Sequence, residues 1–201
     1  MSGTKRGGGG GGPPARRKRA PIGGPRGSSG GTRPRLGARV AAVQALFQSE
    51  ASGESAETVL DQFVRHRLGD PPEGDDGGYE EGRVPAADVP LFVAIVRGVG
   101  RNAATLDGIV ASHLAAGWTM DRLDPVLRAI LRAGCHELWA GSDPPARVVL
   151  NEYLDVAHGF LDGEEPRFAN GVLNALAHRL RPDEFAAEPA APAPAPAPAA
   201  T

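Results

Sequence analysis

Apolar residues recur at three- and four-residue intervals along most of the chain between residues 35 and 182. This period places them on one face of an α-helix, so it predicts amphipathic helices packed around a shared core. The pattern divides into six segments. No stretch alternates polar and apolar residues, and the β-branched residues fall inside helical periods, so we expect an all-α fold.

Three helices are predicted in the first half of this region. The first is expected to end near Ser49, and Ser52 or Ser55 caps the second. Asp88 caps the third, which we expect to bend near Gly98 because glycine weakens a helix. The three apolar stripes are Leu36, Val40, Val43 and Phe47; Val59, Leu60, Phe63 and Val64; and Phe92, Ile95, Val99, Leu106, Ile109, Val110 and Leu114.

Three more helices are predicted in the second half. Asp124 followed by Pro125 indicates a helix start, because Asp caps a helix and Pro fits its first turn. The same pair at Asp143 and Pro144 predicts a fifth helix, and Pro166 opens a sixth. The expected ends are Gly141, about Leu161 and the residue before Pro182.

Three segments lack the apolar residues that a core requires. Residues 1–34 are dominated by Gly, Pro, Ser and Arg, and residues 183–201 alternate Ala and Pro. We therefore predict a disordered basic arm and a disordered, extended tail. Residues 70–88 are acidic and rich in helix breakers, which predicts a flexible surface loop. One domain of six to seven helices, 35–182, remains.

The net charge of −2 hides a segregation of charge along the chain. Nine of the 22 Lys and Arg lie within residues 1–35, which contain none of the 24 Asp and Glu. A basic arm on an acidic body indicates that a polyanion would be held locally, where Arg33, Arg35 and Arg39 lead into the first helix. A GC-rich genome also produces many arginines, so charge alone leaves nucleic-acid binding open.

Composition and motifs argue against several classes of protein. Cys135 is the only cysteine, which excludes an intrachain disulfide and fits a reducing cytoplasm. No apolar run reaches the roughly 20 residues that span a bilayer. His136 and Glu137 begin like a zinc-protease helix, but Ala140 stands where the second histidine is needed. We find no phosphate-binding loop or nucleophile elbow, and expect no enzyme, metal or cofactor.

A second candidate cluster, Arg167, Phe168 and Asn170, opens the sixth helix. A guanidinium, an aromatic ring and an amide at a helix N-terminus can hold single-stranded RNA by phosphate contact, stacking and hydrogen bonding. Phe168 is also in register with Val172 and Leu176, which favours a core position, and Asn170 could cap its own helix. On the residues alone both interpretations stay open.

Six short stretches occur in a recognisable order: AAVQALF at 41–47, LDGI at 106–109, ILR at 130–132, HEL at 136–138, VVLNE at 148–152 and RFANGVL at 167–173. Together they resemble the NusB family of bacterial transcription antitermination factors, and the last stretch is the most specific. The resemblance covers about residues 35–182. It implies two packed helical bundles that bind the boxA element of nascent RNA.

The resemblance also implies partners and contact residues. The protein partner would be NusE, a small-subunit ribosomal protein, and the pair would act in the antitermination complex of RNA polymerase on ribosomal RNA operons. By position, Arg35 and Arg39 on the first helix and Arg167 and Phe168 on the sixth would contact RNA, with Glu164 nearby. We therefore expect the starts of these two helices to lie on one strip of the surface.

The NusE surface implied by the resemblance comprises Phe47, Asp121 and Leu127, where Leu127 replaces an acid of the family pattern. The family's run of consecutive arginines is also thinned here. We expect Arg16, Arg17, Lys18 and Arg19 of the arm to supply compensating phosphate contacts.

Two other interpretations compete with this one. The chain could be the NusB-like module of an RNA cytosine methyltransferase, in which case it would be a fragment, because neither a methyl-donor fold nor a downstream cysteine is present. It could also be a helical adaptor that binds protein only, with Phe47 and Phe168 both buried.

Overall fold

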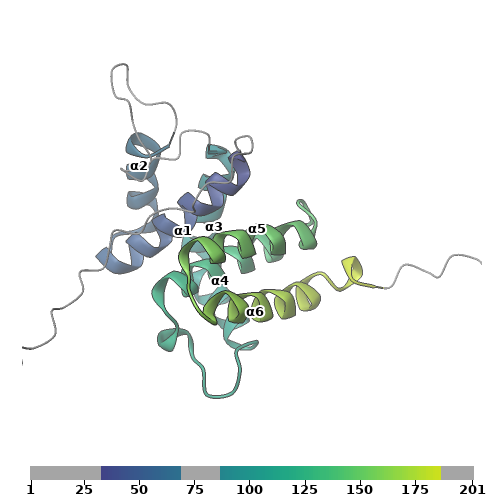
Figure 1. The fold of residues 1–201 in the computed structure, drawn as a ribbon. Coiled ribbons are helices and arrows are strands. Elements are labelled where there is room, and N and C mark those ends of the chain that lie inside the picture. The colour runs from purple at the N-terminus through teal and green to yellow at the C-terminus, as the bar shows by residue number, and fades with distance from the viewer. Residues whose placement is uncertain (1–32, 69–86, 187–201) are drawn as a thin grey trace, which may run out of the picture.

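The computed structural model of the chain describes residues 33–68 and 87–186. These ranges form α-helices and short 3-10 helices and contain no β-strand, which confirms the all-α prediction (Figure 1). The basic arm up to residue 32, the acidic loop from 69 to 86 and the tail from 187 lie outside the described residues. The elements are α1 (Pro34–Ser52), α2 (Ala56–His66), α3 (Val89–Ala111), η2 (Met120–Arg122), α4 (Pro125–Ala140), α5 (Ala146–Phe160), α6 (Glu165–Leu180) and η3 (Pro182–Glu184).

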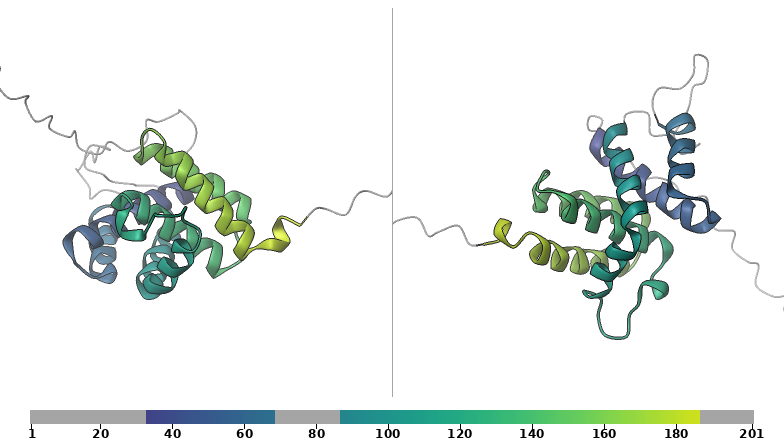
Figure 2. Two further views of the ribbon diagram at one scale, coloured as in Figure 1. Left: turned by 90° about the horizontal axis from the view of Figure 1, so that it is seen from below. Right: turned by 180° about the vertical axis from the view of Figure 1, so that it is seen from behind.

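The helices form two bundles. α1, α2 and α3 pack on one another, and so do α4, α5 and α6. α4 also packs against α1 and α3, which joins the two bundles through one apolar core. Figures 1 and 2 show α2 on the side of the molecule remote from α6. The two-bundle arrangement implied by the resemblance is confirmed.

Predicted caps account for the starts of three helices. The side chains of Ser55, Asp88 and Asp124 each accept a hydrogen bond of 2.8–3.1 Å from a backbone N–H in the first turn of α2, α3 and α4. Such a bond satisfies one of the donors that the first turn leaves without a helical partner. Ser55, not Ser52, is therefore the cap of α2.

Two predicted boundaries were wrong. α1 continues past Ser49 to Ser52 and is capped by Gly53, whose φ of 75° lies in the left-handed region that glycine adopts without a steric penalty. α5 does not start at Pro144: the Asp143–Pro144 bond is cis, Pro145 is extended, and helical backbone begins at Ala146.

The bend in α3 lies at Asn102, one turn beyond the predicted position. Asn102 has non-helical angles (φ −120°, ψ 17°) inside an otherwise continuous helix. Its side-chain amide donates a 2.8 Å hydrogen bond to the carbonyl of Gly98. This bond ties the side chain at the bend to the preceding turn of α3.

The described domain extends four residues past the predicted boundary at 182. The ring of Phe185 packs against that of His178 on α6, with 4.0 Å between the centroids. The Glu184 carboxylate accepts a 2.5 Å hydrogen bond from the backbone N–H of Ala146, the first residue of α5. Buried Arg181 donates to the carbonyl oxygen of Leu138 at 2.8 Å. These contacts fasten the end of α6 to α4 and α5.

Candidate nucleic-acid interface

Two of the predicted RNA-binding arginines are exposed at the start of α1. Arg35 is exposed. Arg33 is half-exposed, and its guanidinium donates to Glu152 at 2.5 Å and to Asp155 at 2.7 Å, both on α5. The hydrogen bond to Asp155, together with that to Glu152, raises the pKa of Arg33 above its ordinary value. Because Asp155 is itself half-exposed, a phosphate could compete for the Arg33 guanidinium.

Arg39, predicted to contact RNA, is instead buried with 1% of its surface exposed. Its Nε and Nη2 atoms donate to the two Glu137 oxygens at 2.9 and 2.7 Å, and Nη1 donates to Glu152 at 3.3 Å. The Tyr153 hydroxyl donates to Glu137 at 2.7 Å. The prediction for Arg39 is therefore wrong, because a guanidinium inside this network cannot reach an RNA phosphate without unpacking α1.

The Arg39 guanidinium keeps its charge despite its burial. Burial alone would lower the pKa of Arg39, but its hydrogen bonds to Glu137 and the charge of that carboxylate raise it above the ordinary value. Burial and the same carboxylate raise the pKa of Tyr153 well above its ordinary value, so its hydroxyl remains a donor. The network joins α1, α4 and α5 and is structural.

At the start of α6 the predicted residues are exposed, except for the aromatic ring. The side chain of Arg167 is 86% exposed, and its Nη1 atom lies 3.8 Å from Oε2 of Glu164, which is also exposed. Asn170 is exposed in the second turn of α6, so it does not cap that helix. Phe168 is half-buried against the core and tilted against Trp118, with 5.5 Å between the ring centroids. Neither earlier interpretation of Phe168 holds alone, because the ring is both a core contact and part of the surface.

The starts of α1 and α6 lie on the same side of α5. Asp155, which binds Arg33, is one helical turn from His158, and His158 lines a groove together with Asp162, Arg167 and Asn170. α5 thus places the two helix starts along a single strip of the surface, with Asp155, His158 and Asp162 between them. We call this surface the RNA strip. The strip also carries acids, so its positive charge is concentrated at the two helix starts.

Of the three residues predicted to contact NusE, the structure leaves two accessible at the surface and buries the third. Phe47 is half-buried and lines an apolar pocket with Val43, Val126 and Phe160. Asp121 is exposed in η2. Leu127, however, is 3% exposed, so it is a core residue of α4 and its prediction as a contact was wrong.

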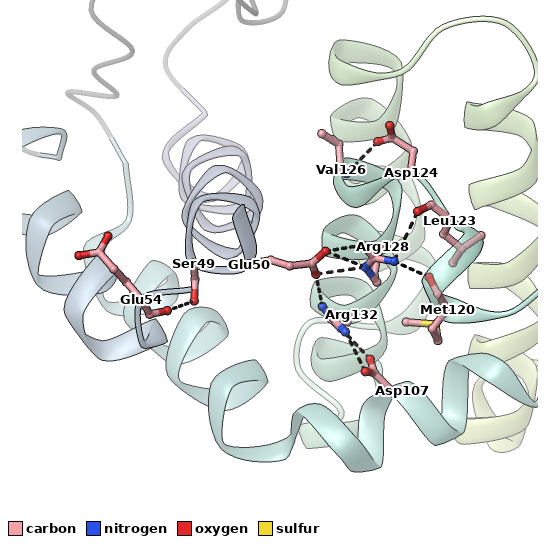
Figure 3. A network of polar contacts seen from close by, with 10 residues as sticks. All are labelled: Ser49, Glu50, Glu54, Asp107, Met120, Leu123, Asp124, Val126, Arg128 and Arg132. Carbon is pink, nitrogen blue, oxygen red and sulfur yellow. Dashed lines mark hydrogen bonds and ion pairs between the residues drawn. The ribbon is translucent and has the colours of Figure 1, made fainter. Parts of the chain in front are cut away.

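A network of charges fixes the end of α1 against η2 and α4 (Figure 3). The Glu50 carboxylate pairs with Arg128 and also with Arg132, at 2.6 Å. Arg128 in turn donates a 2.5 Å hydrogen bond to the carbonyl oxygen of Met120 in η2. Arg132 grips the carboxylate of Asp107 on α3 with two bonds of 2.6 and 2.7 Å. Because Phe47 lies one turn before Glu50, this network holds the Phe47 pocket beside η2, which carries Asp121.

The described ranges contain no obvious alternative chemistry. No three side chains of His, Cys, Asp or Glu gather there in a metal-binding arrangement. Cys135 is buried, and burial raises the pKa of its thiol to about 12, which leaves it unreactive in the core. None of the helices in these ranges is both long and apolar enough to cross a bilayer.

Comparison with known proteins accounts for this arrangement. The sequence profile of the NusB family matches residues 36–178. The chain belongs to the NusB family. The transcription antitermination protein NusB of Granulibacter bethesdensis is 59% identical over 157 residues, which are 78% of this chain and 95% of that protein. That of Gluconobacter oxydans is 50% identical over 147 residues, 73% of this chain and 88% of the relative.

Solved structures share the fold. NusB of T. maritima superposes with a TM-score of 0.59 at 25% identity, covering 77% of this chain and 99% of that one. A chain in a complex of the antitermination factors NusB and NusE with double-stranded RNA has the same TM-score at 24% identity, covering 74% and 99%. At that identity the likeness to the second structure concerns the fold.

Several stretches that resemble the NusB family contain structural residues. Asp107 of LDGI pairs with Arg132 of ILR, and Glu137 of HEL and Glu152 of VVLNE hold Arg39. Local sequence did contain a signal for Arg39, because it lies three residues after Leu36 and four residues before Val43, and both of these belong to the apolar face of the helix. Its acidic partners could not be found in this way. Trp118, beside Phe168, was missed entirely.

Proposed function

We propose that this NusB-family chain is a transcription antitermination factor that binds boxA RNA together with NusE and acts with RNA polymerase on ribosomal RNA operons. Relatives of 50–59% identity over most of the chain carry the name of an antitermination protein. The protein would act as a regulator, not an enzyme, and in the cytoplasm, where transcription takes place.

The observation that carries the proposal is that exposed Arg35 and Arg167 lie in the first turns of α1 and α6, while Arg33 at the start of α1 contacts Asp155 on α5. Helix N-termini carry a partial positive charge and unpaired N–H groups, so both positions attract phosphate. Phosphate contacts position the RNA but carry no sequence information. Base recognition falls to Asn170 and the Phe168 ring, with Glu164 as an acceptor at the edge of the site.

We place the NusE contact at the Phe47 pocket and at Asp121 in η2. An apolar pocket beside an exposed acid suits a partner that inserts an apolar side chain next to a basic one. Leu127 supports this surface from inside α4 and does not touch the partner.

Fluorescence anisotropy with a labelled boxA-like RNA, with and without NusE, tests the proposal. We expect binding that NusE strengthens and that a scrambled RNA does not reproduce. Arg35→Ala and Arg167→Ala should each lower the slope of log affinity against log salt by about 0.7, the value for one lost phosphate contact on a single strand. Arg101→Ala, an exposed arginine on α3, is the matched control.

A chain that bound NusE but neither RNA would contradict the proposal and favour the protein-only adaptor. Equal affinity for boxA-like and scrambled RNA would leave only nonspecific charge attraction. Either result is separable from a folding defect, because the circular dichroism spectrum of each variant reports whether the helices are intact.

A further inference from the structure

Trp118, in the loop between α3 and η2, presents an exposed aromatic surface beside the α6 start. It is one of two tryptophans in the chain, and 46% of its surface is exposed. Its ring lies against Phe168, whose own ring is half-buried. The larger exposed aromatic surface at this place therefore belongs to Trp118, with Phe168 as its support.

The loop backbone holds Trp118 in a defined position. Its N–H donates to the Ala115 carbonyl at 3.0 Å, which closes a turn, and Gly117 in that turn has a φ of 85°. The Arg122 guanidinium donates to the Gly117 carbonyl at 2.6 Å, which ties the turn to η2. A side chain fixed before binding loses less entropy when a ligand stacks on it.

Two cations flank the aromatic pair. Arg122 is exposed, and its guanidinium carbon lies over the Trp118 ring, 5.7 Å from the centroid. Arg167 precedes Phe168 in α6 and is also exposed. Aromatic rings with adjacent arginines bind single-stranded nucleic acid by base stacking and phosphate contact. A protein partner would need acidic groups for these arginines and would lie on the RNA strip.

We propose that Trp118 is a stacking platform for an unpaired nucleobase of the bound RNA. This inference rests on the proposed function and extends its RNA strip from α1, past α5 and the start of α6, to the loop of residues 112–119. The base stacks on the exposed indole, Phe168 supports the indole from the α6 side, and Arg122 is placed to contact a phosphate of the same strand.

Tryptophan fluorescence tests the stacking directly in the full chain. In Trp139→Phe, Trp118 is the sole tryptophan, and titration with boxA-like single-stranded RNA should quench its emission with the same midpoint as anisotropy. In Trp118→Phe, the remaining Trp139, which is exposed on α4, should change little. RNA binding without quenching in the first variant would overturn the inference.

Affinity provides the second test. Trp118→Leu keeps an apolar cover on Phe168 but removes the π-face, so it should weaken RNA binding by roughly 5- to 150-fold, whereas Trp118→Phe should retain most of the affinity. Trp139→Leu is the matched control and should bind as the wild type does. Equal affinities of Trp118→Leu and wild type would contradict the stacking role.

An RNA series with one abasic nucleotide at a time identifies the stacked base. One abasic position should weaken binding to the wild type but not to Trp118→Leu, because the contact is already missing in that variant. Sensitivity at no position, or equal sensitivity of both proteins at every position, would overturn the inference while leaving the proposed function intact. Failure of the wild type to bind any of these RNAs would overturn both. Loss of NusE binding alone in Trp118→Leu would assign Trp118 to the protein partner instead.

Discussion

Arg33, Arg35 and Arg39 lie within seven residues but occupy three different environments. Arg33 shares its charge with two acids at the surface, Arg35 is exposed, and Arg39 is enclosed by carboxylates and the Tyr153 ring. Desolvating a guanidinium is costly unless every donor is matched by an acceptor. Glu137 matches two donors of Arg39 with a fork geometry, so the buried charge is held without loss of the fold.

Removing Arg39 should therefore damage the fold, whereas removing Arg35 should damage RNA binding. Arg39→Ala leaves the Glu137 carboxylate buried without its cation, and we expect the free energy of unfolding to fall by about 3–5 kcal/mol. Arg35→Ala should change it by less than about 0.5 kcal/mol. Urea unfolding followed by circular dichroism measures both. A fully stable Arg39→Ala that has lost RNA affinity would reverse our assignment.

Asp155 pairs with Arg33, so if Arg33 contacts RNA as proposed, neutralising Asp155 should strengthen RNA binding. An exposed ion pair of this kind is worth up to about 1 kcal/mol, which corresponds to a gain in affinity of no more than about fivefold for Asp155→Asn. Asp61→Asn, which removes the same charge from an exposed site on α2, controls for the change in net charge. Equal gains in both variants would show that only net charge matters.

At the scale of helices, local signals predicted well and distant contacts did not. The capping side chains of α2, α3 and α4 act within three residues of the helix start, so the sequence alone reveals them. The ties of Glu50 to Arg128 and Arg132 join residues 78 and 82 positions apart, and no periodicity encodes such pairs. Whether a charged residue beside the apolar face of a helix is structural or free to bind a ligand could therefore be decided only from the structure.

The Glu50 ties should make stability depend on pH below neutrality. Partial burial would raise the pKa of Glu50, but hydrogen bonds from Arg128 and Arg132 lower it below the ordinary value of 4.5. A lowered carboxyl pKa stabilises the fold above the unfolded pKa, and that stabilisation is lost as the pH falls through the folded pKa. Wild type should exceed Glu50→Gln in melting temperature at pH 7, and the difference should shrink below about pH 4.5. A difference that stayed constant down to pH 3 would contradict this assignment.

Across the whole molecule, the order of the helices was predictable, but which of the candidate contact residues lie on the surface and which lie in the core was not. Leu127 and Arg39 were assigned to contacts through resemblance, yet both side chains point into the core. Resemblance aligns positions, whereas burial depends on how α4 packs against the other helices. Trp118 escaped notice because it follows no periodic pattern.

The segregation of charge along the chain leads to a prediction for the arm, which lies outside the described residues. Residues 1–30 hold seven Lys and Arg and no acid. If the arm contacts phosphates, deleting it should flatten the slope of log RNA affinity against log salt. A variant with Arg16, Arg17, Lys18 and Arg19 changed to Gln keeps the length and should flatten the slope in part. An unchanged slope in both would exclude the arm from binding.

The buried ion pair of Arg39 also constrains how the protein is made. Glu137 lies 98 positions after Arg39, and Glu152 lies 113 positions after it. While the ribosome is still synthesising the second bundle, the Arg39 guanidinium has no carboxylate to enter the core with, so it must remain hydrated. α1 can therefore pack in its final position only after α4 and α5 have emerged from the exit tunnel. A nascent chain stalled before that point should expose the apolar face of α1 to chaperones and proteases.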